Sequence, residues 1–386
     1  MIAQAVILCG GKGSRLKNLT KKIPKPLLKV NKKPFIEYQI ENLSRHGIKD
    51  IILLCCYKYE LFKKKYHQKK ILNSKVICIN EKKPLGTGGG LLILKRKLNK
   101  YFYVLNGDTI FDINYLDFEK KFQKKNLICI ATTNKKGSRF GKISKSNKSI
   151  NAGVYILNKK ILRLFNKSFI SLENDIFPKL KYKKKIQTIY YEKNKHNFLD
   201  IGIPSDFKKA QKKIIKSYIK PAVFLDRDGV INEDYGYVYK KNNFAWKKGI
   251  FNLIKFFNDI NYYVFVISNQ SGIGRGYYKT SDVNNLHEWV QKRLAEKGAH
   301  IDKFYFAPYF YENISFTIKD KKMRKPNTGM INLALKEWKI NMKKSILIGD
   351  QENDKILAKK IKVKFFMVTK TNNLVEILRK VKKLYN

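Results

Sequence analysis

Short apolar runs alternate with longer amphipathic stretches along this 386-residue chain. The apolar runs have the length of buried strands, and the amphipathic stretches have the length of helices that cover a sheet. This alternation predicts an α/β fold built from doubly wound, parallel sheets. Strands are expected near residues 5–9, 51–55, 76–79, 101–105 and 127–131 in the first half, and near 222–225, 263–267, 304–306, 346–348 and 365–368 in the second; helices include 35–45 and 89–98.

The chain is long for a single hydrophobic core and suits two domains. The amphipathic stretch 205–218 has the pattern of a last covering helix, and Pro221 then opens a new apolar run. No low-complexity linker separates the two halves. We therefore expect two domains, residues 1–219 and residues 220–386.

The cysteines point to a reducing compartment. Cys9, Cys55, Cys56, Cys78 and Cys129 all lie in the first half, mostly inside apolar runs, and no CxxC pair occurs. A disulfide framework is therefore not expected. The start of the chain has no basic segment ahead of its short apolar run, and no segment has membrane-spanning length. We expect a cytoplasmic protein.

The formal net charge of +52 raises the question of nucleic-acid binding. Only ten of the 82 basic residues are arginine, and the lysines are spread over every expected helix and loop. The best candidate patch, residues 57–70, interleaves aromatic and basic side chains, but a solvated helix face also explains it. We expect small-molecule partners, no specific nucleic acid and no membrane. The sequence leaves homo-oligomer formation open.

A glycine-rich segment follows directly on the first apolar run. Gly10, Gly11 and Gly13 allow backbone N–H groups to approach phosphate oxygens, and Ser14 opens a turn that can supply further donors. Arg15 can grip a phosphate through its planar guanidinium. Such a loop alone is a weak signal, because ordinary strand-to-helix turns also contain glycine.

Four further segments accompany this loop along the chain. They read PKPLL at 24–28, EKKPLGTGGG at 81–90, LNGDTIFD at 105–112 and FLDIGIPSD at 198–206. Together with the loop they closely resemble the sugar-phosphate nucleotidyltransferase family, over about residues 1–215. The resemblance implies a Rossmann-like domain in which a sugar 1-phosphate oxygen attacks the α-phosphorus of a nucleoside triphosphate and pyrophosphate leaves. Positioning and charge neutralisation carry such a reaction.

The same resemblance implies roles for individual residues. Arg15 would hold the leaving pyrophosphate, and Lys25 would neutralise the α-phosphate. Asp108 and Asp200 would hold Mg²⁺. Nucleotide and phosphate contacts are expected from Gly10, Gly11, Gly13, Ser14, Gly86, Thr87 and Gly88, and substrate contacts from Asn151 and Glu173.

One segment departs from the family pattern. Family members usually carry a Glu-Lys pair, followed by a loop, before the strand that corresponds to residues 150–155. Here residues 141–151 contain only Gly, Lys, Ile, Ser and Asn, so this segment looks shortened. Lys142 or Lys145 could take the place of the family's lysine. The shortening bears on the efficiency of the transferase more than on its fold.

A second site is predicted at the apolar run 222–225, which ends in Asp226-Arg227-Asp228-Gly229-Val230. Two carboxylates two residues apart at the end of a strand repel each other unless a cation lies between them. Three more polar segments follow expected strands or their loops: VISNQ at 266–270, RKP at 324–326 and IGD at 348–350. This set resembles the haloacid dehalogenase-like phosphatases, over residues 221–386. The resemblance implies a second Rossmann-like domain.

The phosphatase resemblance implies that Asp226 is the nucleophile and forms an aspartyl-phosphate. Asp228 would protonate the leaving oxygen and later activate water. Mg²⁺ would be held by Asp226, Asp350 and the main chain of Asp228. Ser268 and Asn269 would hold phosphoryl oxygens, and Lys325 would neutralise charge around Asp226. Contacts to distal substrate groups are expected from Arg275 and Arg324.

A finer resemblance, carried by FLDRDGVINEDYGYV and SNQSGIGRGYY, is to heptose bisphosphate and histidinol-phosphate phosphatases. These enzymes lack a large cap domain, and no insertion here is long enough to form one. They usually hold a structural zinc through Cys-x-His and Cys-x-Cys. The corresponding positions here are Ala307, Tyr309, Lys321 and Met323, and none of them is a zinc ligand. We expect no structural zinc, and an aromatic cluster in its place drawn from Phe306, Tyr309, Phe310, Tyr311 and Phe316.

Two such sites on one chain indicate consecutive reactions. A phosphatase acting on a heptose 1,7-bisphosphate leaves the heptose 1-phosphate that a guanylyltransferase joins to a nucleotide, with GTP as the expected triphosphate. The sequence leaves open another nucleotide sugar, histidinol phosphate as the phosphatase substrate, and a first domain that only binds a sugar nucleotide. RNA binding is an alternative from a different class.

Overall fold

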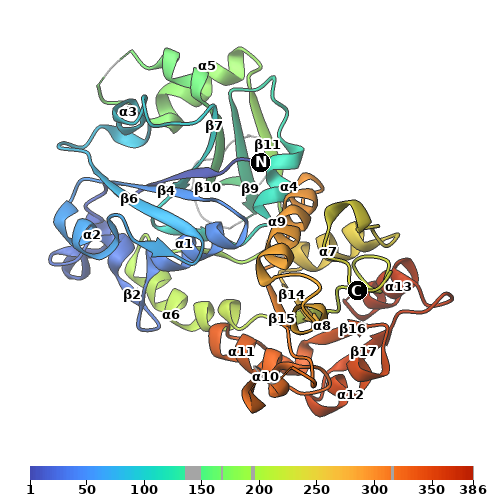
Figure 1. Cartoon of the computed structure of the whole chain (residues 1–386). Coiled ribbons are helices and arrows are strands. Elements are labelled where there is room, and N and C mark those ends of the chain that lie inside the picture. Colours follow the sequence, from blue (N-terminus) through green and yellow to red (C-terminus); the bar gives the residue numbers. More distant parts are fainter. Residues whose placement is uncertain (135–148, 167, 193–195, 314–316, 386) are drawn as a thin grey trace. The chain divides into compact units, whose positions relative to one another are not determined.

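The computed structural model describes residues 1–134, 149–166, 168–192, 196–313 and 317–385. The chain separates into two compact units, Met1–Ser217 and Tyr218–Asn386, which the colours of Figure 1 distinguish along the sequence. Lys142, Lys145 and Phe316, all singled out above, lie outside the described residues. Within those ranges, no helix combines the length and the apolar character needed to cross a membrane.

The first unit contains an eight-stranded sheet. Its strands are, in chain order, β1 (Gln4–Leu8), β4 (Asp50–Cys55), β5 (Lys70–Ile71), β6 (Ser74–Asn80), β7 (Tyr101–Asn106), β9 (Ile128–Asn134), β10 (Ser149–Asn158) and β11 (Ile186–Tyr190), and their order across the sheet is β11-β9-β10-β7-β1-β4-β6-β5. Strands β7, β1, β4 and β6 run parallel, as predicted. Strand β10 runs antiparallel between β7 and β9, so the sheet is mixed. The apolar pattern of a strand does not encode its direction.

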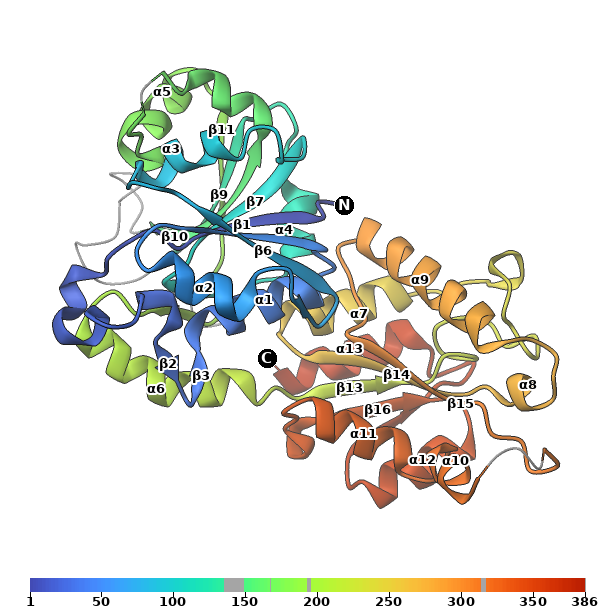
Figure 2. The same cartoon turned by 60° about the vertical axis from the view of Figure 1, so that its left-hand side comes forward.

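Helices cover both faces of this sheet. The α-helices are α1 (Phe35–Arg45), α2 (Tyr59–Tyr66), α3 (Gly86–Ile93), α4 (Tyr115–Lys121), α5 (Phe177–Tyr182) and α6 (Pro204–Tyr218). Short helical elements are η1 (Ser14–Thr20), η2 (Lys25–Leu27), η3 (Lys159–Leu164) and η4 (Leu172–Ile176). Two small two-stranded sheets are formed by β2 (Lys29–Val30) with β3 (Lys33–Pro34), and by β8 (Thr109–Phe111) with β12 (Phe198–Asp200). Apolar residues of α1, α2 and α4 fill the core on one face, and those of α3 and α5 fill it on the other. Figure 2 shows α1 and α2 on the opposite side of the sheet from α3.

The second unit is a five-stranded parallel sheet between two helical layers. Its strands are β13 (Ala222–Leu225), β14 (Tyr263–Asn269), β15 (Lys303–Ala307), β16 (Ile346–Gly349) and β17 (Lys364–Met367), in the order β15-β14-β13-β16-β17. Its helices are η5 (Lys241–Asn243), α7 (Ile250–Asp259), α8 (Ser271–Gly274), α9 (Thr280–Glu296), α10 (Ile318–Met323), α11 (Gly329–Glu337), η6 (Met342–Lys344), α12 (Glu352–Lys360) and α13 (Leu374–Tyr385). Residues of α7, α9 and α13 pack on one face, and residues of α11 and α12 pack on the other.

Both sheets have a point where the strand order reverses. Strand β1 lies between β4 and β7, and strand β13 lies between β14 and β16. The loops that leave the carboxyl ends of strands on the two sides of such a point diverge, which opens a crevice for ligands. The predicted phosphate loop follows β1, and Asp226 follows β13, so both predicted sites lie at these crevices.

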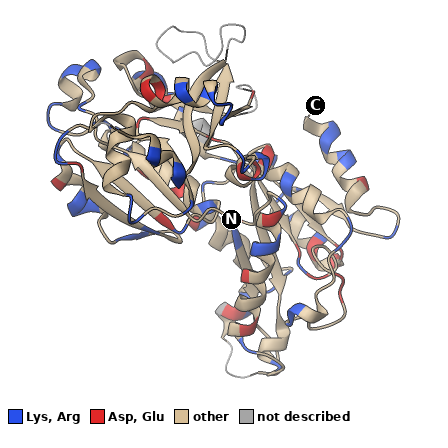
Figure 3. Cartoon of the chain, turned by 90° about the horizontal axis from the view of Figure 1, so that it is seen from above, with Lys and Arg blue, Asp and Glu red and all other residues tan. Residues whose placement is uncertain are grey.

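The aromatic side chains of the candidate RNA-binding stretch face mostly inward. Phe62 and Tyr66 belong to α2 and point into the core, where Phe62 is fully buried and Tyr66 is 2% exposed. The Tyr57 hydroxyl donates to the backbone oxygen of Lys21 at 2.8 Å. Figure 3 shows Lys and Arg residues on helices and loops of both units. With Phe62 and Tyr66 packed in the core, this stretch offers little aromatic surface on which bases could stack.

Candidate active sites

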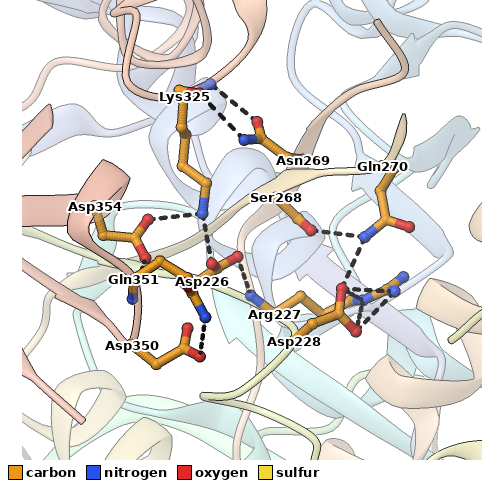
Figure 4. A network of polar contacts seen from close by, with 10 residues as sticks. All are labelled: Asp226, Arg227, Asp228, Ser268, Asn269, Gln270, Lys325, Asp350, Gln351 and Asp354. Carbon is orange, nitrogen blue, oxygen red and sulfur yellow. Dashed lines mark hydrogen bonds and ion pairs between the residues drawn. The ribbon is translucent and has the colours of Figure 1, made fainter. Parts of the chain in front are cut away.

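The second unit gathers its predicted residues around one crevice. Strand ends and loops bring Asp226, Asp228, Ser268, Asn269, Arg324 and Lys325 to the lining of a cavity of about 400 Å³. Asp350 follows β16, next to β13 in the sheet, and so lies close to Asp226. Figure 4 shows how the side chains of this crevice point toward one another.

A buried lysine joins two carboxylates at the centre of the crevice. Lys325 Nζ lies 2.6 Å from Asp226 Oδ2 and 2.7 Å from Asp354 Oδ1. Burial raises the pKa of Asp226, and the Lys325 ammonium opposes that rise. Burial lowers the pKa of Lys325, but the two carboxylates outweigh it and raise this pKa, so the ammonium stays charged. The arrangement places a positive charge beside Asp226, and the catalytic role of Lys325 stays a prediction.

The same crevice offers oxygen ligands to a cation. Carboxylate oxygens of Asp226, Asp350 and Asp354 lie within 4.8 Å of one another. Asp350 Oδ1 is buried and has no hydrogen-bonding partner among the residues that the structure describes. A Cβ at Gly229 would lie 2.1 Å from Asp350 Oδ2, so only glycine allows this close approach. A hard divalent cation such as Mg²⁺ fits this oxygen-rich set, since it would satisfy Asp350.

The Asp228 carboxylate is held away from that cluster. Arg227, which is 1% exposed, donates to it through Nη2 at 2.9 Å. Asn232 Nδ2 and Gln270 Nε2 each donate to it at 2.9 Å. These donors fix the side chain at the lining of the cavity. A metal contact of Asp228 through its main chain stays a prediction.

The sequence motifs assign no role to Arg227, Asn232 or Gln270. Gln270 also donates to Ser268 Oγ at 2.7 Å and accepts from Tyr278 at 2.9 Å, so it links the second motif to Asp228. Its position directly after Ser268 and Asn269 was the available signal. A polar residue beside a motif does not reveal which way its side chain points.

Asn269 holds the backbone of Lys325. Its Oδ1 accepts the Lys325 N–H at 2.9 Å, and its Nδ2 donates to the Lys325 carbonyl at 3.2 Å. This pair of bonds fixes the loop that carries the lysine. The predicted contacts of Ser268 and Asn269 with a phosphoryl group stay predictions.

Two arginines lie close together in the same unit. The Arg275 guanidinium stacks 3.7 Å from the centroid of the Phe310 ring, and Arg324 Nη1 donates to the Tyr309 carbonyl at 3.4 Å. Burial lowers the pKa of Arg324, and the nearby Arg275 lowers it further. Neighbouring guanidinium groups attract an anion, so their position suits a charged distal group of a substrate.

In the first unit, the glycine-rich loop lines a cavity of about 410 Å³. The predicted residues on its walls are Gly10, Gly11, Gly13, Ser14, Arg15, Lys25, Gly86, Thr87 and Asp108. Gly13 has a φ of 67°, in the left-handed region that favours glycine, and a Cβ there would lie 3.2 Å from Lys25 Cβ. The glycine therefore lets the loop turn closely over the lysine.

Two carboxylates lie close to Thr109, and of these Asp108 lines the cavity whereas Asp200 is not among its lining residues. Thr109 Oγ1 lies 3.1 Å from Asp108 Oδ1 and 3.2 Å from Asp200 Oδ2, because β8 and β12 pair at this point. Lys25, which is 6% exposed, forms an ion pair with Asp108. Two carboxylates that lie close to one hydroxyl could bind one divalent cation, which phosphate oxygens of a substrate would also contact.

The predicted substrate residues Asn151 and Glu173 belong to one hydrogen-bonded network. Thr87 Oγ1 donates to Glu173 Oε2 at 2.7 Å, and the Tyr155 hydroxyl donates to Glu173 Oε1 at 3.2 Å. Asn151 Nδ2 donates to the Tyr155 hydroxyl at 2.7 Å. The N–H of Gly88 bonds the backbone oxygen of residue 170 at 2.8 Å, so it serves the fold. Direct substrate contacts of Asn151, Glu173 and Gly88 stay predictions.

Comparison with known proteins divides the chain in the same way. A nucleotidyl transferase family model matches residues 4–217, and a model described as polynucleotide kinase 3 phosphatase matches residues 223–373. The D-glycero-alpha-D-manno-heptose 1-phosphate guanylyltransferase of Campylobacter jejuni is 38% identical over 224 residues, which cover 53% of this chain and 96% of that protein. The D-glycero-alpha-D-manno-heptose-1,7-bisphosphate 7-phosphatase of the same species is 44% identical over 133 residues, which cover 34% of this chain and 73% of that protein. The structure of HddC from Yersinia pseudotuberculosis is 31% identical and covers 55% of this chain and 100% of its own, with a TM-score of 0.47.

Proposed function

The chain belongs to the nucleotidyl transferase family through residues 4–217 and to a phosphatase family through residues 223–373, and on that premise we propose that it makes a GDP-activated heptose in two steps. The phosphatase unit (Tyr218–Asn386) removes the 7-phosphate of D-glycero-α-D-manno-heptose 1,7-bisphosphate. The transferase unit (Met1–Ser217) then joins the heptose 1-phosphate to the GMP part of GTP. One observation carries this proposal: the two relatives from one species are named for consecutive compounds, and both likenesses occur here on one chain.

Phosphate removal begins at Asp226. Lys325 holds one of its carboxylate oxygens, and the Arg227 N–H donates to the other at 2.7 Å, so the nucleophile is fixed before substrate arrives. A carboxylate oxygen of Asp226 attacks the phosphorus, the bond from phosphorus to the sugar oxygen breaks, and an aspartyl-phosphate forms. Lys325 offsets the negative charge that gathers in this step.

Asp228 acts as the general acid and then as the general base. It gives a proton to the leaving sugar oxygen and then takes one from the water that hydrolyses the aspartyl-phosphate, which releases inorganic phosphate. Arg227, Asn232 and Gln270 hold its carboxylate in place for both steps. Arg275 and Arg324 suit the 1-phosphate that the sugar keeps.

The transferase unit works by positioning two anions. Arg15 and the N–H groups of the glycine-rich loop hold the triphosphate, and Lys25 neutralises its α-phosphate. An oxygen of the sugar 1-phosphate attacks the α-phosphorus, and the bond to the β-phosphate oxygen breaks. The products are a GDP-sugar and pyrophosphate.

Both families generally use Mg²⁺, and both sites have residues that suit it. Asp108 and Asp200 would hold it in the transferase unit, and Asp226 and Asp350 in the phosphatase unit. When bound, Mg²⁺ neutralises phosphate charge and orients the reacting oxygens.

Replacing Asp108 by alanine should lower pyrophosphate release by about a thousandfold or more, because the Mg²⁺ that would neutralise the triphosphate then loses a ligand. The exposed Asp50→Ala is the matched control, and near-normal turnover of Asp108→Ala would show that the metal assignment is wrong.

Substrate panels test the proposal at each site. With Mg²⁺ and the α-heptose 1-phosphate, pyrophosphate release should be fastest with GTP among GTP, ATP, UTP, CTP and dTTP. Phosphate release should favour the α-heptose 1,7-bisphosphate over its β-anomer and over histidinol phosphate. Faster hydrolysis of histidinol phosphate would replace the heptose assignment. Tight nucleotide binding without pyrophosphate release from any pair would mean that the first unit only binds a sugar nucleotide.

A further inference from the structure

A lysine-rich loop, residues 16–24, lies beside the transferase cavity. The residues at its two ends, Arg15 and Lys25, both line the cavity. Between them, Lys17, Lys21 and Lys22 are exposed and do not belong to the cavity wall. In the described ranges, none of these three ammonium groups has a carboxylate partner. The reaction proposed above gives them no role.

Contacts with the phosphate loop hold this segment in place. Thr20 Oγ1 donates to the Gly13 carbonyl at 3.0 Å. A Cβ at Gly13 would lie 3.1 Å from Thr20 Cγ2, so the segment folds back against the phosphate loop. From the turn after β4, Lys58 Nζ donates to the Lys22 carbonyl at 3.0 Å, which brings a fourth ammonium to the same surface. We call these four side chains the lysine rim: Lys17, Lys21, Lys22 and Lys58.

The charge of this surface has one sign. Residues 12–33 contain nine lysines and arginines and no acidic residue, and the first acidic residue of the chain is Glu37. The walls of the cavity, by contrast, carry the carboxylates of Glu81 and Asp108. An anion that approaches the cavity past the lysine rim therefore meets positive charge before it meets the carboxylates inside.

We propose that the lysine rim steers the nucleoside triphosphate into the transferase cavity. Fixed charges around a concave site raise the association rate of an oppositely charged ligand by about 10- to 1000-fold. The attraction acts over about 10 Å at 0.1 M salt, so it requires no contact with the bound ligand. Charges at the rim of a site change association more than dissociation. The inference rests on the proposed transferase function, which makes the triphosphate the ligand, and the rim lysines act before the chemical step.

The test measures the association of GTP that carries a fluorescent label on its ribose. Stopped-flow mixing is done with Mg²⁺ and without sugar phosphate, so that no turnover occurs. For the unaltered protein, the association rate constant should fall by about 30-fold between about 20 mM and about 500 mM salt. In the triple variant K17Q, K21Q, K22Q it should be about fivefold lower at low salt and unchanged at high salt. The dissociation rate constant should change by less than about twofold.

Two matched variants separate local steering from total charge. The first replaces the same three lysines by arginine (K17R, K21R, K22R) and should keep the association rate, because the charge is kept. The second, K120Q, K124Q, K125Q, removes three exposed charges next to the amino end of β9. Strand β9 runs parallel to β1, so this end lies at the edge of the sheet opposite to the phosphate loop. This variant should lower the association rate by less than about twofold.

Several results would overturn the inference. Association to the unaltered protein that does not depend on salt would exclude steering, whether or not the variants fold. An equal loss in the two glutamine variants would make total charge the cause. A loss that persists at high salt, or faster dissociation, would mean that the lysines contact the bound nucleotide. Unchanged association with lost retention of single-stranded RNA at low salt would assign the rim to a nucleic acid.

The proposed function is tested separately on the same proteins. At saturating GTP and heptose 1-phosphate, pyrophosphate release should be the same in the unaltered protein and in all three variants, because steering acts before the chemical step. If no protein releases pyrophosphate but association keeps its dependence on salt and on the rim lysines, the transferase function fails and steering stands. If the unaltered protein binds no triphosphate, both fail.

Discussion

At the scale of single residues, the phosphatase crevice depends on one ammonium shared by two buried carboxylates. Lys325 contacts Asp226 and Asp354, and Asp354 is completely buried. Removing the ammonium would leave two buried carboxylates without a positive charge between them, which is costly. Asp354 therefore acts as a positioning residue: it holds the lysine where the lysine can neutralise charge beside the nucleophile.

Replacing the nucleophile tests this site directly. Asp226→Asn should lower phosphate release by at least about a thousandfold, because an amide cannot form the aspartyl-phosphate. Pyrophosphate release should remain near normal, since every residue assigned to that reaction belongs to the other unit. Both products are measured on the same preparation. Loss of pyrophosphate release from a folded Asp226→Asn protein would show that the two sites are coupled.

The motifs located residues that line one cavity, but not the residues that hold them in place. Short patterns at strand ends were enough to place Asp226, Asp228 and Lys325 around one cavity. The motifs could not predict that Arg227 and Gln270 donate to the Asp228 carboxylate, because these bonds depend on side-chain direction. The packing of the unit determines that direction.

At the scale of elements, helix α9 carries a buried histidine that makes stability depend on pH. His287 stacks on Phe304 at 4.2 Å between ring centroids, and its Nε2 is buried without a partner in the described part of the chain. Burial lowers its pKa to about 3, and the positive charge of Arg227 lowers it in the same direction. The folded phosphatase unit therefore holds this imidazole neutral.

This histidine should destabilise the phosphatase unit in acid. Its stabilising contribution is present above the unfolded pKa of about 6.5 and is lost as the pH falls toward 3, because the unfolded chain binds the proton first. Between pH 7 and pH 5 the free energy of unfolding should fall by about 2 kcal/mol from this group. Urea unfolding of the unaltered protein and of His287→Leu measures the difference. The same pH dependence in both proteins would exclude His287 as its source.

A loop next to β15 is held by an aromatic clamp. Phe310 lies under the Arg275 guanidinium, and Asn313 Nδ2 donates to the Gly274 carbonyl at 2.7 Å. The expected aromatic cluster is present in part, since Phe310 and Tyr311 pack edge to face at 4.8 Å between ring centroids. Phe306 instead contacts the His287 ring.

This clamp leads us to expect that the phosphatase unit needs no structural zinc. Purified protein should contain far less than one zinc per chain, and its melting temperature should not change after treatment with a mild chelator. Metal analysis by mass spectrometry gives the answer. Near-stoichiometric zinc that survives dialysis against the chelator would contradict the expectation.

Element positions followed from the sequence better than element directions did. The apolar runs gave the five strands of the second unit to within a few residues, because strands buried on both faces must be apolar throughout. Helix α3 begins at Gly86 rather than Gly89, since the glycines there allow the chain to pass close to residues 168–170. The antiparallel course of β10 is set by contacts distant in sequence.

At the scale of the whole molecule, each unit has its own apolar cores. We expect fragments 1–219 and 220–386 to fold separately, because a cut after residue 219 leaves helix α6 intact and divides none of these cores. The first fragment should release pyrophosphate and the second should release phosphate. Thermal unfolding and the two assays check this. A fragment that fails to fold alone would show that the units depend on each other.

The central claim is that one chain performs two consecutive reactions on one sugar. The most direct measurement follows the full-length protein by phosphorus NMR after D-glycero-α-D-manno-heptose 1,7-bisphosphate, GTP and Mg²⁺ are added together. We predict that heptose 1-phosphate and inorganic phosphate appear together first, and that GDP-heptose and pyrophosphate follow. At completion, one phosphate and one pyrophosphate should have been released for each GDP-heptose formed. Asp226→Asn should stop this sequence at the bisphosphate, and added heptose 1-phosphate should restore GDP-heptose formation. Release of phosphate without any GDP-heptose, even when heptose 1-phosphate and GTP are supplied, would contradict the account.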